Sequence, residues 1–233
     1  MTNEIELASA AHLGVEPPRA LEGRGRTELS VIWLHGMGQG PEHPEAVARR
    51  LALPEAGVRG VFPRAPAQSR SSLTGRSASS WFVQSIDRLW MVDLPSLQAT
   101  ETKLHALIDS EVERFGAGRV ALAGFSQGAV TALYCGLRYR LPLAGIAVYA
   151  AFPLRGLDFF DEQHPVTASV PLWIGHGRRD WVVPFGSGEQ VRDELSSRGH
   201  PVQWRRYRGG HEIFGGVGGE LAEFFEGLKG HGS

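Results

Sequence analysis

Apolar positions along the chain fall into short continuous runs that alternate with amphipathic segments. The runs predict strands at residues 29–34, 58–62, 119–123, 143–149, 171–177 and 202–207. Between them, helical spacing or composition predicts helices at residues 44–53, 97–115, 129–137, 187–198 and 217–228. Continuous apolar runs are typical of strands buried on both faces of a parallel sheet. We therefore expect an α/β fold, with a mainly parallel sheet and helices on both of its faces.

Two stretches depart from this alternation. Residues 1–28 contain a Pro pair and a Gly-Arg repeat, and we expect them to form an N-terminal arm or an edge hairpin before a single domain at residues 29–233. Residues 64–95 form the longest segment without regular periodicity, and they carry Trp81 and Trp90. Such long loops are often functional. This one either forms a wall or flap over a site, or its tryptophans simply pin it to the core.

A serine between two glycines separates one predicted strand from the helix after it. The stretch Gly124-Phe125-Ser126-Gln127-Gly128 follows the strand at residues 119–123. A serine on a sharp, strained turn requires small neighbours, since larger side chains would collide with the strand and helix. In a chain with 30 glycines the pattern alone is weak evidence, and its strand-turn-helix setting gives it weight.

Further candidates for catalysis lie where other predicted strands end. Met37, Asp180 and His211 each follow such a strand, as Ser126 does. A serine hydroxyl needs a base to remove its proton, and His211 can reach it from the loop after the last strand. Asp180 can orient the imidazole, and the backbone N–H groups of Met37 and Gln127 can stabilise an oxyanion. The order serine, aspartate, histidine is that of α/β-hydrolases.

Other residues compete for the same roles. Asp158 and Asp161 are alternative acids, but neither follows a clear strand. His176 is an alternative base, although its place in the same strand exit as Asp180 favours a supporting role. The nine histidines are scattered without a local metal-binding pair, so we expect neither a metal nor another cofactor.

These residues resemble the acyl-protein thioesterase and carboxylesterase branch of the α/β-hydrolases, the phospholipase/carboxylesterase-like family. The resemblance rests on Leu34-His35-Gly36-Met37-Gly38, Phe62-Pro63-Arg64-Ala65-Pro66, Ser80-Trp81-Phe82, Gly124-Phe125-Ser126-Gln127-Gly128, His176-Gly177 with Asp180 and Val182-Val183-Pro184, and Gly210-His211-Glu212. It implies a catalytic triad of Ser126, His211 and Asp180, and an oxyanion hole of Met37 and Gln127. No large separate lid domain is evident in the sequence, which favours short to medium acyl chains.

Composition and charge narrow the class of protein. A net charge of −1 argues against a dedicated nucleic-acid-binding protein. The one cysteine, Cys135, lies in an apolar helix and is expected to be buried and inert, and it excludes an intramolecular disulfide. No stretch is long and apolar enough to span a membrane, and no signal peptide is evident, so we expect a cytoplasmic protein.

The sequence thus predicts a serine carboxylesterase that cleaves short to medium acyl esters through an acyl-enzyme, with thioesters as an alternative substrate. Its substrate is expected to be a small ester or thioester whose acyl chain lies against Trp81 and Val182. An acyl-protein thioesterase or lysophospholipid esterase, a peptidase or lactonase, and a non-catalytic binding protein with a hydrolase fold are the alternatives.

Overall fold

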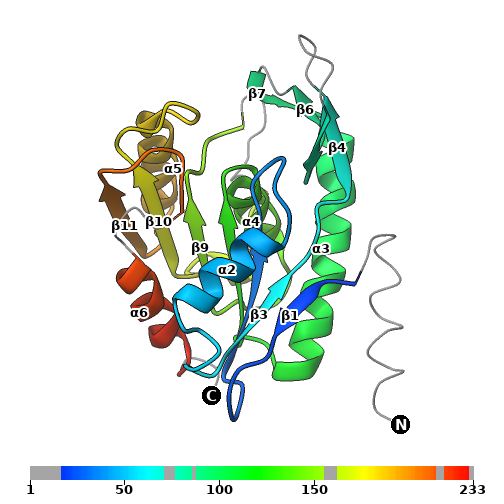
Figure 1. Ribbon diagram of the computed structural model, residues 1–233, viewed down its shortest axis with the longest axis vertical. Helices are drawn as coiled ribbons and strands as arrows, with labels where there is room; N and C mark the ends of the chain where they lie inside the picture. The colour runs from blue at the N-terminus through cyan, green and yellow to red at the C-terminus, as the bar shows by residue number, and fades with distance from the viewer. Residues whose placement is uncertain (1–16, 71–76, 86–87, 155–161, 214–217, 231–233) are drawn as a thin grey trace.

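The centre of the protein is a seven-stranded, mainly parallel β-sheet (Figure 1). The computed structural model describes residues 17–70, 77–85, 88–154, 162–213 and 218–230. In spatial order the strands are β1 (Arg19–Leu21), β3 (Val58–Phe62), β2 (Leu29–Leu34), β8 (Val120–Phe125), β9 (Gly145–Tyr149), β10 (Leu172–Gly177) and β11 (Val202–Tyr207). All neighbouring pairs are parallel except β1 with β3. The carboxyl ends of the parallel strands therefore share one edge.

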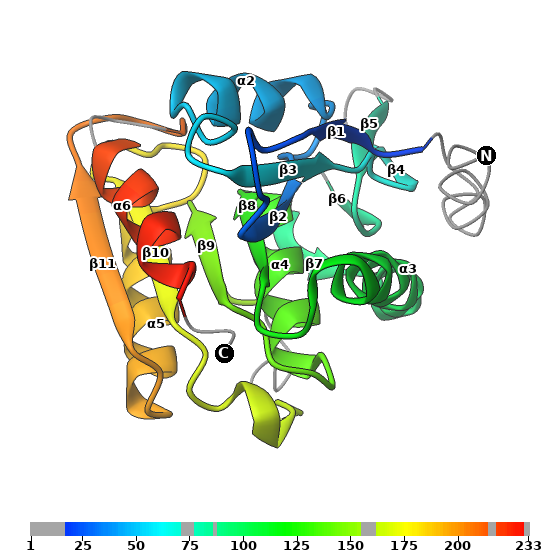
Figure 2. The ribbon, with the colours of Figure 1, turned by 90° about the horizontal axis from the view of Figure 1, so that it is seen from below.

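Helices cover both faces of the sheet. They are α2 (Glu42–Arg50), α3 (Leu94–Phe115), α4 (Gln127–Arg138), α5 (Phe185–Ser197) and α6 (Gly218–Leu228), with a short 3-10 helix, η2 (Pro165–Thr167). Figure 2 shows α2 on one side of the sheet and α3 and α4 on the other. The α/β class and the mainly parallel sheet expected from the sequence are confirmed.

Alternate side chains of the central strand β2 enter two separate cores. Ile32 and Leu34 pack with residues of α3, α4 and α5. Val31 and Trp33 face the opposite way, toward α2 and α6, where the Trp33 and Phe225 rings lie 6.0 Å apart. Successive side chains of a strand point to opposite faces, so a strand between two helical layers is apolar on both faces except where a buried polar side chain has a partner, as Ser30 has in Glu111. This requirement explains the continuous apolar run at residues 29–34.

The start of the described chain adds an edge strand to the sheet. β1 pairs antiparallel with β3, so Arg19 lies opposite Phe62. Within residues 1–28, for which an arm or an edge hairpin was expected, the stretch Arg19–Leu21 is thus extended and paired with β3. The first 16 residues lie outside the described structure.

The segment at residues 64–95 is more regular than its sequence suggests. It contains two small antiparallel sheets, β4 (Ala67–Arg70) with β5 (Ser77–Ser80) and β6 (Gln84–Ser85) with β7 (Arg88–Val92). Figure 1 places β4, β6 and β7 beside the edge where the parallel strands end. The expectation of an irregular loop was wrong because strands this short, rich in serine and arginine, carry no detectable apolar period.

Candidate active site

Ser126 occupies a strained turn between β8 and α4. Its backbone has φ 55° and ψ −118°, a region that residues other than glycine rarely adopt. The turn is held by a hydrogen bond from the Ser126 N–H to the Tyr149 carbonyl oxygen at 2.9 Å. Because the chain reverses within one residue, the serine stands just beyond the end of the sheet, where the helix begins.

Two glycines allow the helix to approach the strands this closely. A Cβ atom on Gly124 would lie 2.3 Å from the carbonyl oxygen of Gly128. A Cβ atom on Gly128 would lie 2.4 Å from the carbonyl oxygen of Leu34, at the end of β2. Both clashes involve backbone atoms, which cannot move aside as a flexible side chain can. The need for small residues on each side of Ser126, expected from the sequence, has this steric origin.

A chain of hydrogen bonds joins three side chains at the carboxyl ends of different strands. The Nε2 atom of His211 lies 3.0 Å from the Ser126 Oγ, and its Nδ1 atom lies 2.8 Å from the Asp180 Oδ2. When Nδ1 carries the proton and donates it to the carboxylate, Nε2 is free to accept the serine proton. The structure thus brings together the three residues predicted to form a triad.

The carboxylate of Asp180 is bound on both of its oxygens. Its Oδ1 accepts hydrogen bonds from the N–H groups of Val182 and Val183 at 2.9 and 2.8 Å. Burial raises the pKa of Asp180, but hydrogen bonds with His176, His211 and the Val183 N–H outweigh it and hold the pKa well below its usual range. The low pKa therefore keeps the Asp180 carboxylate charged, so that it can stabilise a protonated imidazole on His211.

The structure describes one of the three alternative candidates for the base and the acid. His176 is fully buried, and its Nε2 lies 3.0 Å from the Val183 carbonyl oxygen and 3.5 Å from the Asp180 Oδ2. It contacts the acid rather than the serine, in keeping with the supporting role expected from the sequence. Asp158 and Asp161 lie outside the described residues.

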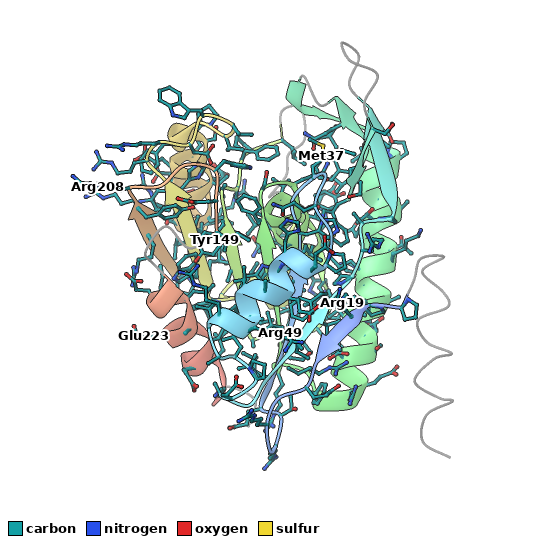
Figure 3. All side chains as sticks on the ribbon, in the orientation of Figure 1. Arg19, Met37, Arg49, Tyr149, Arg208 and Glu223 are labelled. Atoms are coloured by element: carbon teal, nitrogen blue, oxygen red, sulfur yellow. The ribbon has the colours of Figure 1, made fainter. Side chains whose placement is uncertain are left out.

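The two backbone amides expected to bind an oxyanion come from different elements. Met37 lies in the loop after β2, and Figure 3 shows it beyond the strand ends. Gln127 is the first residue of α4, and the N–H groups at the start of a helix have no partner within that helix. Within the described part of the chain, neither amide has a protein acceptor. Both are free to donate to a ligand.

Trp81 lies in the core rather than on an open pocket wall. Its side chain is 3% exposed, and its Nε1 donates a hydrogen bond to the His35 carbonyl oxygen at 2.7 Å. Its ring lies 5.0 Å from the His35 ring. Of the two roles left open by the sequence, this burial favours pinning the segment to the core, since the indole has little surface left for a substrate.

Two buried polar side chains beside the site were not singled out from the sequence. The carboxamide of Gln127 is hydrogen-bonded on both its oxygen and its nitrogen. His35 donates from Nδ1 to the Gly36 carbonyl oxygen and accepts from the Ala65 N–H at Nε2. Each follows the end of an apolar strand, where a buried polar side chain needs a hydrogen-bond partner from another part of the chain. The sequence could not identify those partners.

Comparison with known proteins identifies the family. The sequence matches the phospholipase/carboxylesterase family over residues 18–227. The chain belongs to this family. It is 33% identical over 220 residues to a probable carboxylesterase of Oryza sativa subsp. japonica, with 90% of this chain and 89% of the relative covered. It is 29% identical over 215 residues to acyl-protein thioesterase 1 of Neurospora crassa, covering 86% and 87% of the two chains.

Solved structures share the fold. The crystal structure of Zea mays acyl-protein thioesterase 2 has a TM-score of 0.76 at 23% identity, covering 91% of this chain and 99% of that one. The Bacillus cereus carboxylesterase has a TM-score of 0.74 at 16% identity, covering 94% and 99%. Family membership makes this chain a carboxylic ester hydrolase, as predicted from the sequence.

Two further properties concern only the residues that the structure describes. None of their helices has the length and apolar character needed to cross a bilayer. They also contain no group of three or more His, Cys, Asp or Glu side chains placed to hold a metal ion.

Proposed function

We propose that this hydrolase acts through a serine nucleophile, with Ser126 attacking the substrate, His211 as base and Asp180 as the acid that orients His211. The observation that carries the proposal is the continuous hydrogen-bond chain from Asp180 Oδ2 through both nitrogens of His211 to the Ser126 Oγ. The strained turn supports it, because such strain persists where the surrounding structure holds a reactive group in place.

In the first half of the reaction, the Ser126 Oγ forms a bond to the carbonyl carbon while His211 Nε2 takes the hydroxyl proton. The carbonyl oxygen becomes an oxyanion, which accepts hydrogen bonds from the N–H groups of Met37 and Gln127. The intermediate collapses by breaking the bond to the alcohol or thiol. His211 protonates this leaving group, and the acyl group stays on the serine oxygen.

In the second half, water takes the place of the alcohol. His211 Nε2 accepts a proton from the water as its oxygen attacks the acyl carbon, and the same amides bind the second oxyanion. Breaking the bond to the Ser126 Oγ releases the carboxylic acid, and the proton on His211 returns to the serine. Throughout, the low pKa of Asp180 keeps its carboxylate charged beside the imidazolium.

We further propose short to medium acyl esters, and thioesters of similar size, as substrates. Two exposed apolar residues directly follow Asp180: Trp181 is 92% exposed and Val182 is 51% exposed. The bonds from the Val182 and Val183 amides to Asp180 hold this turn in place, so Val182 offers an apolar surface beside the triad. Acyl-protein thioesters or lysophospholipid esters are the alternative, and a cytoplasmic location stays a prediction.

Replacement of the nucleophile tests the mechanism. Ser126→Ala should lower kcat on p-nitrophenyl esters by about 10⁴-fold or more, since the acyl-enzyme cannot form. It should also abolish labelling by a fluorophosphonate probe. The matched control is Ser197→Ala, which removes an exposed hydroxyl at the end of α5 and should keep full activity.

The same assay, run from acetate to decanoate esters and with matched thioesters, defines the acyl preference. Highest kcat/KM on the longest chains would contradict the proposed substrate size. Retention of most esterase activity by folded Ser126→Ala would overturn the proposed nucleophile. A folded parent protein that neither turns over esters nor takes up the probe would instead indicate a binding protein.

A further inference from the structure

One short segment contacts both elements that carry the proposed oxyanion-hole amides. Residues 79–84 run between the loop after β2 and the start of α4. On the loop side, the Gly38 N–H donates to the Ser79 carbonyl oxygen, and the Ser79 Oγ donates to the Gln39 carbonyl oxygen, both at 2.8 Å. The indole of Trp81 donates to the His35 carbonyl oxygen, also on that side. The segment therefore holds the Met37 loop on both sides of Met37.

On the helix side, the same segment is held by the Gln127 side chain. The Gln127 Oε1 accepts from the Trp81 N–H at 2.9 Å. Its Nε2 donates to the Phe82 carbonyl oxygen at 3.0 Å and to the Gln84 Oε1 at 2.7 Å. Gln127 is 1% exposed, so these bonds replace water that the carboxamide cannot reach. Trp81 is thus bonded to Gln127 through its backbone and to His35 through its indole.

The strand ladder alone does not set the distance between the two amides. Pairing of β2 with β8 ends at Leu34 opposite Gly124, and both Met37 and Gln127 lie beyond that last pair. Their N–H groups must nevertheless point at one oxygen atom, and donors of this kind are effective when they are held in place before the charge develops. Contacts beyond the strand ends therefore contribute to the separation of the two amides: the packing of Gly128 against the end of β2, and the hydrogen bonds of segment 79–84.

We propose that the Gln127 carboxamide and the Trp81 indole are positioning residues that fix the separation of the Met37 and Gln127 amides. The connection runs from Gln127 to Trp81, from Trp81 to the His35 carbonyl, and along the chain to Met37. The inference rests on the proposed function, because it assigns a task to the same oxyanion hole. It also separates two roles of Gln127, whose backbone serves the reaction and whose side chain serves the geometry.

His35 makes the loop end of this connection rigid. Its ring is fully buried and fixed at both nitrogens, by the Gly36 carbonyl oxygen at 2.8 Å and the Ala65 N–H at 3.1 Å. Burial lowers the pKa of His35, which keeps the ring neutral and able to accept at Nε2. His35, two residues before Met37, is therefore held by three hydrogen bonds, two at its ring and one at its carbonyl oxygen.

Two variants test the proposal without removing either amide. Gln127→Met keeps the backbone N–H and the approximate shape but loses all three side-chain hydrogen bonds. Trp81→Phe keeps an aromatic ring but loses the bond to the His35 carbonyl. Each should lower kcat by about 10- to 100-fold with KM within about threefold, since loss of a whole oxyanion donor costs about 10²- to 10³-fold. Binding of a trifluoromethyl ketone, whose adduct carries an oxyanion, should weaken in parallel.

The control is Thr131→Val, which removes a buried hydrogen bond from the Thr131 Oγ1 to the Gln127 carbonyl oxygen without touching segment 79–84. It should lower the urea midpoint as the test variants do, yet keep kcat within about threefold of the parent. If Gln127→Met fails to fold, Trp81→Phe decides the question.

The outcomes separate the two proposals. Active Ser126→Ala would overturn the proposed function itself. Inactive Ser126→Ala combined with parental kcat in a folded Gln127→Met or Trp81→Phe variant would overturn only the positioning role. An equal loss of kcat in Thr131→Val would also overturn it, because general destabilisation would then explain the effect. Labelling of all three variants by the fluorophosphonate probe verifies that Ser126 is still present and accessible.

Discussion

At the scale of single residues, Asp180 binds more partners than the orientation of His211 requires. One carboxylate oxygen faces His211, while the other accepts two backbone N–H groups from the turn that follows. The same side chain therefore contacts the proposed base and holds the turn that carries Trp181 and Val182.

Asp180→Asn should separate these two tasks. Asparagine can still accept from the Val182 and Val183 amides, but its NH₂ group favours the histidine tautomer that has its proton on Nε2. That tautomer cannot take the serine proton, and we expect kcat to fall by about 10⁴-fold with little change in KM. Steady-state kinetics on one aryl ester measures both. A loss of less than about tenfold would contradict the assigned role.

The same variant should change the acid stability. Folding lowers the pKa of Asp180 from its ordinary value of 3.8, so its carboxylate stabilises the fold above that value and the contribution is lost as the pH falls. Urea midpoints measured from about pH 6 to pH 3 should fall less steeply for Asp180→Asn than for the parent. Parallel curves would show that Asp180 is not the group responsible.

At the scale of elements, the turn between β8 and α4 depends on the close approach of the helix to two strands. Gly128 lies against the carbonyl of Leu34, so α4 is fixed by β2 as well as by its own strand. This contact places the first turn of α4, which begins with the Gln127 N–H group, beside the loop that carries Met37. The glycine therefore determines where the helix starts in space, which the sequence motif alone does not specify.

Gly128→Ala should destabilise the protein strongly. Its Cβ would meet backbone oxygens of Leu34 and His35, and we expect a loss of about 3 kcal/mol in the free energy of unfolding, measured with urea. Gly227→Ala in α6 is the control, because its Cβ would meet nothing within 4 Å and alanine favours helix. A Gly128→Ala variant as stable as Gly227→Ala would contradict the steric argument.

At the scale of the whole molecule, the two ends of the sheet have different tasks. The carboxyl ends of the strands carry the candidate site. Near the amino ends, the buried carboxylate of Glu111 on α3 accepts hydrogen bonds from the Ser30 Oγ at 2.5 Å and the Arg59 Nε at 3.0 Å. This cluster joins α3 to β2 and β3 far along the strands from Ser126.

Glu111→Gln should therefore reduce stability without reducing catalysis. The change removes the buried one of the two carboxylates that Arg59 contacts and leaves the more exposed Glu22, so we expect a loss of about 2 kcal/mol with kcat unchanged below the unfolding temperature. The control is Glu194→Gln, which breaks an exposed pair with Arg198 and should cost less than about 1 kcal/mol. A fall in kcat of the folded Glu111→Gln variant would indicate that the two ends are coupled.

The sequence by itself determined the fold class and the candidate triad, for a physical reason. Apolar runs and helical periods are local, and parallel strands bring their carboxyl ends to one edge, so Ser126, Asp180 and His211 could be grouped without knowing any contact. The need for glycines around Ser126 could also be predicted from the sequence, because the turn that requires them is made of neighbouring residues.

Only the tertiary structure decided what Trp81 and the Gln127 side chain do. Their hydrogen bonds join residues 46 positions apart, and no local period reports such a pairing. The short strands β4 to β7 were missed because they are formed by pairing with each other rather than by an apolar core. Local sequence patterns therefore indicate which residues could react, whereas long-range hydrogen bonds, which only the tertiary structure contains, hold those residues in place.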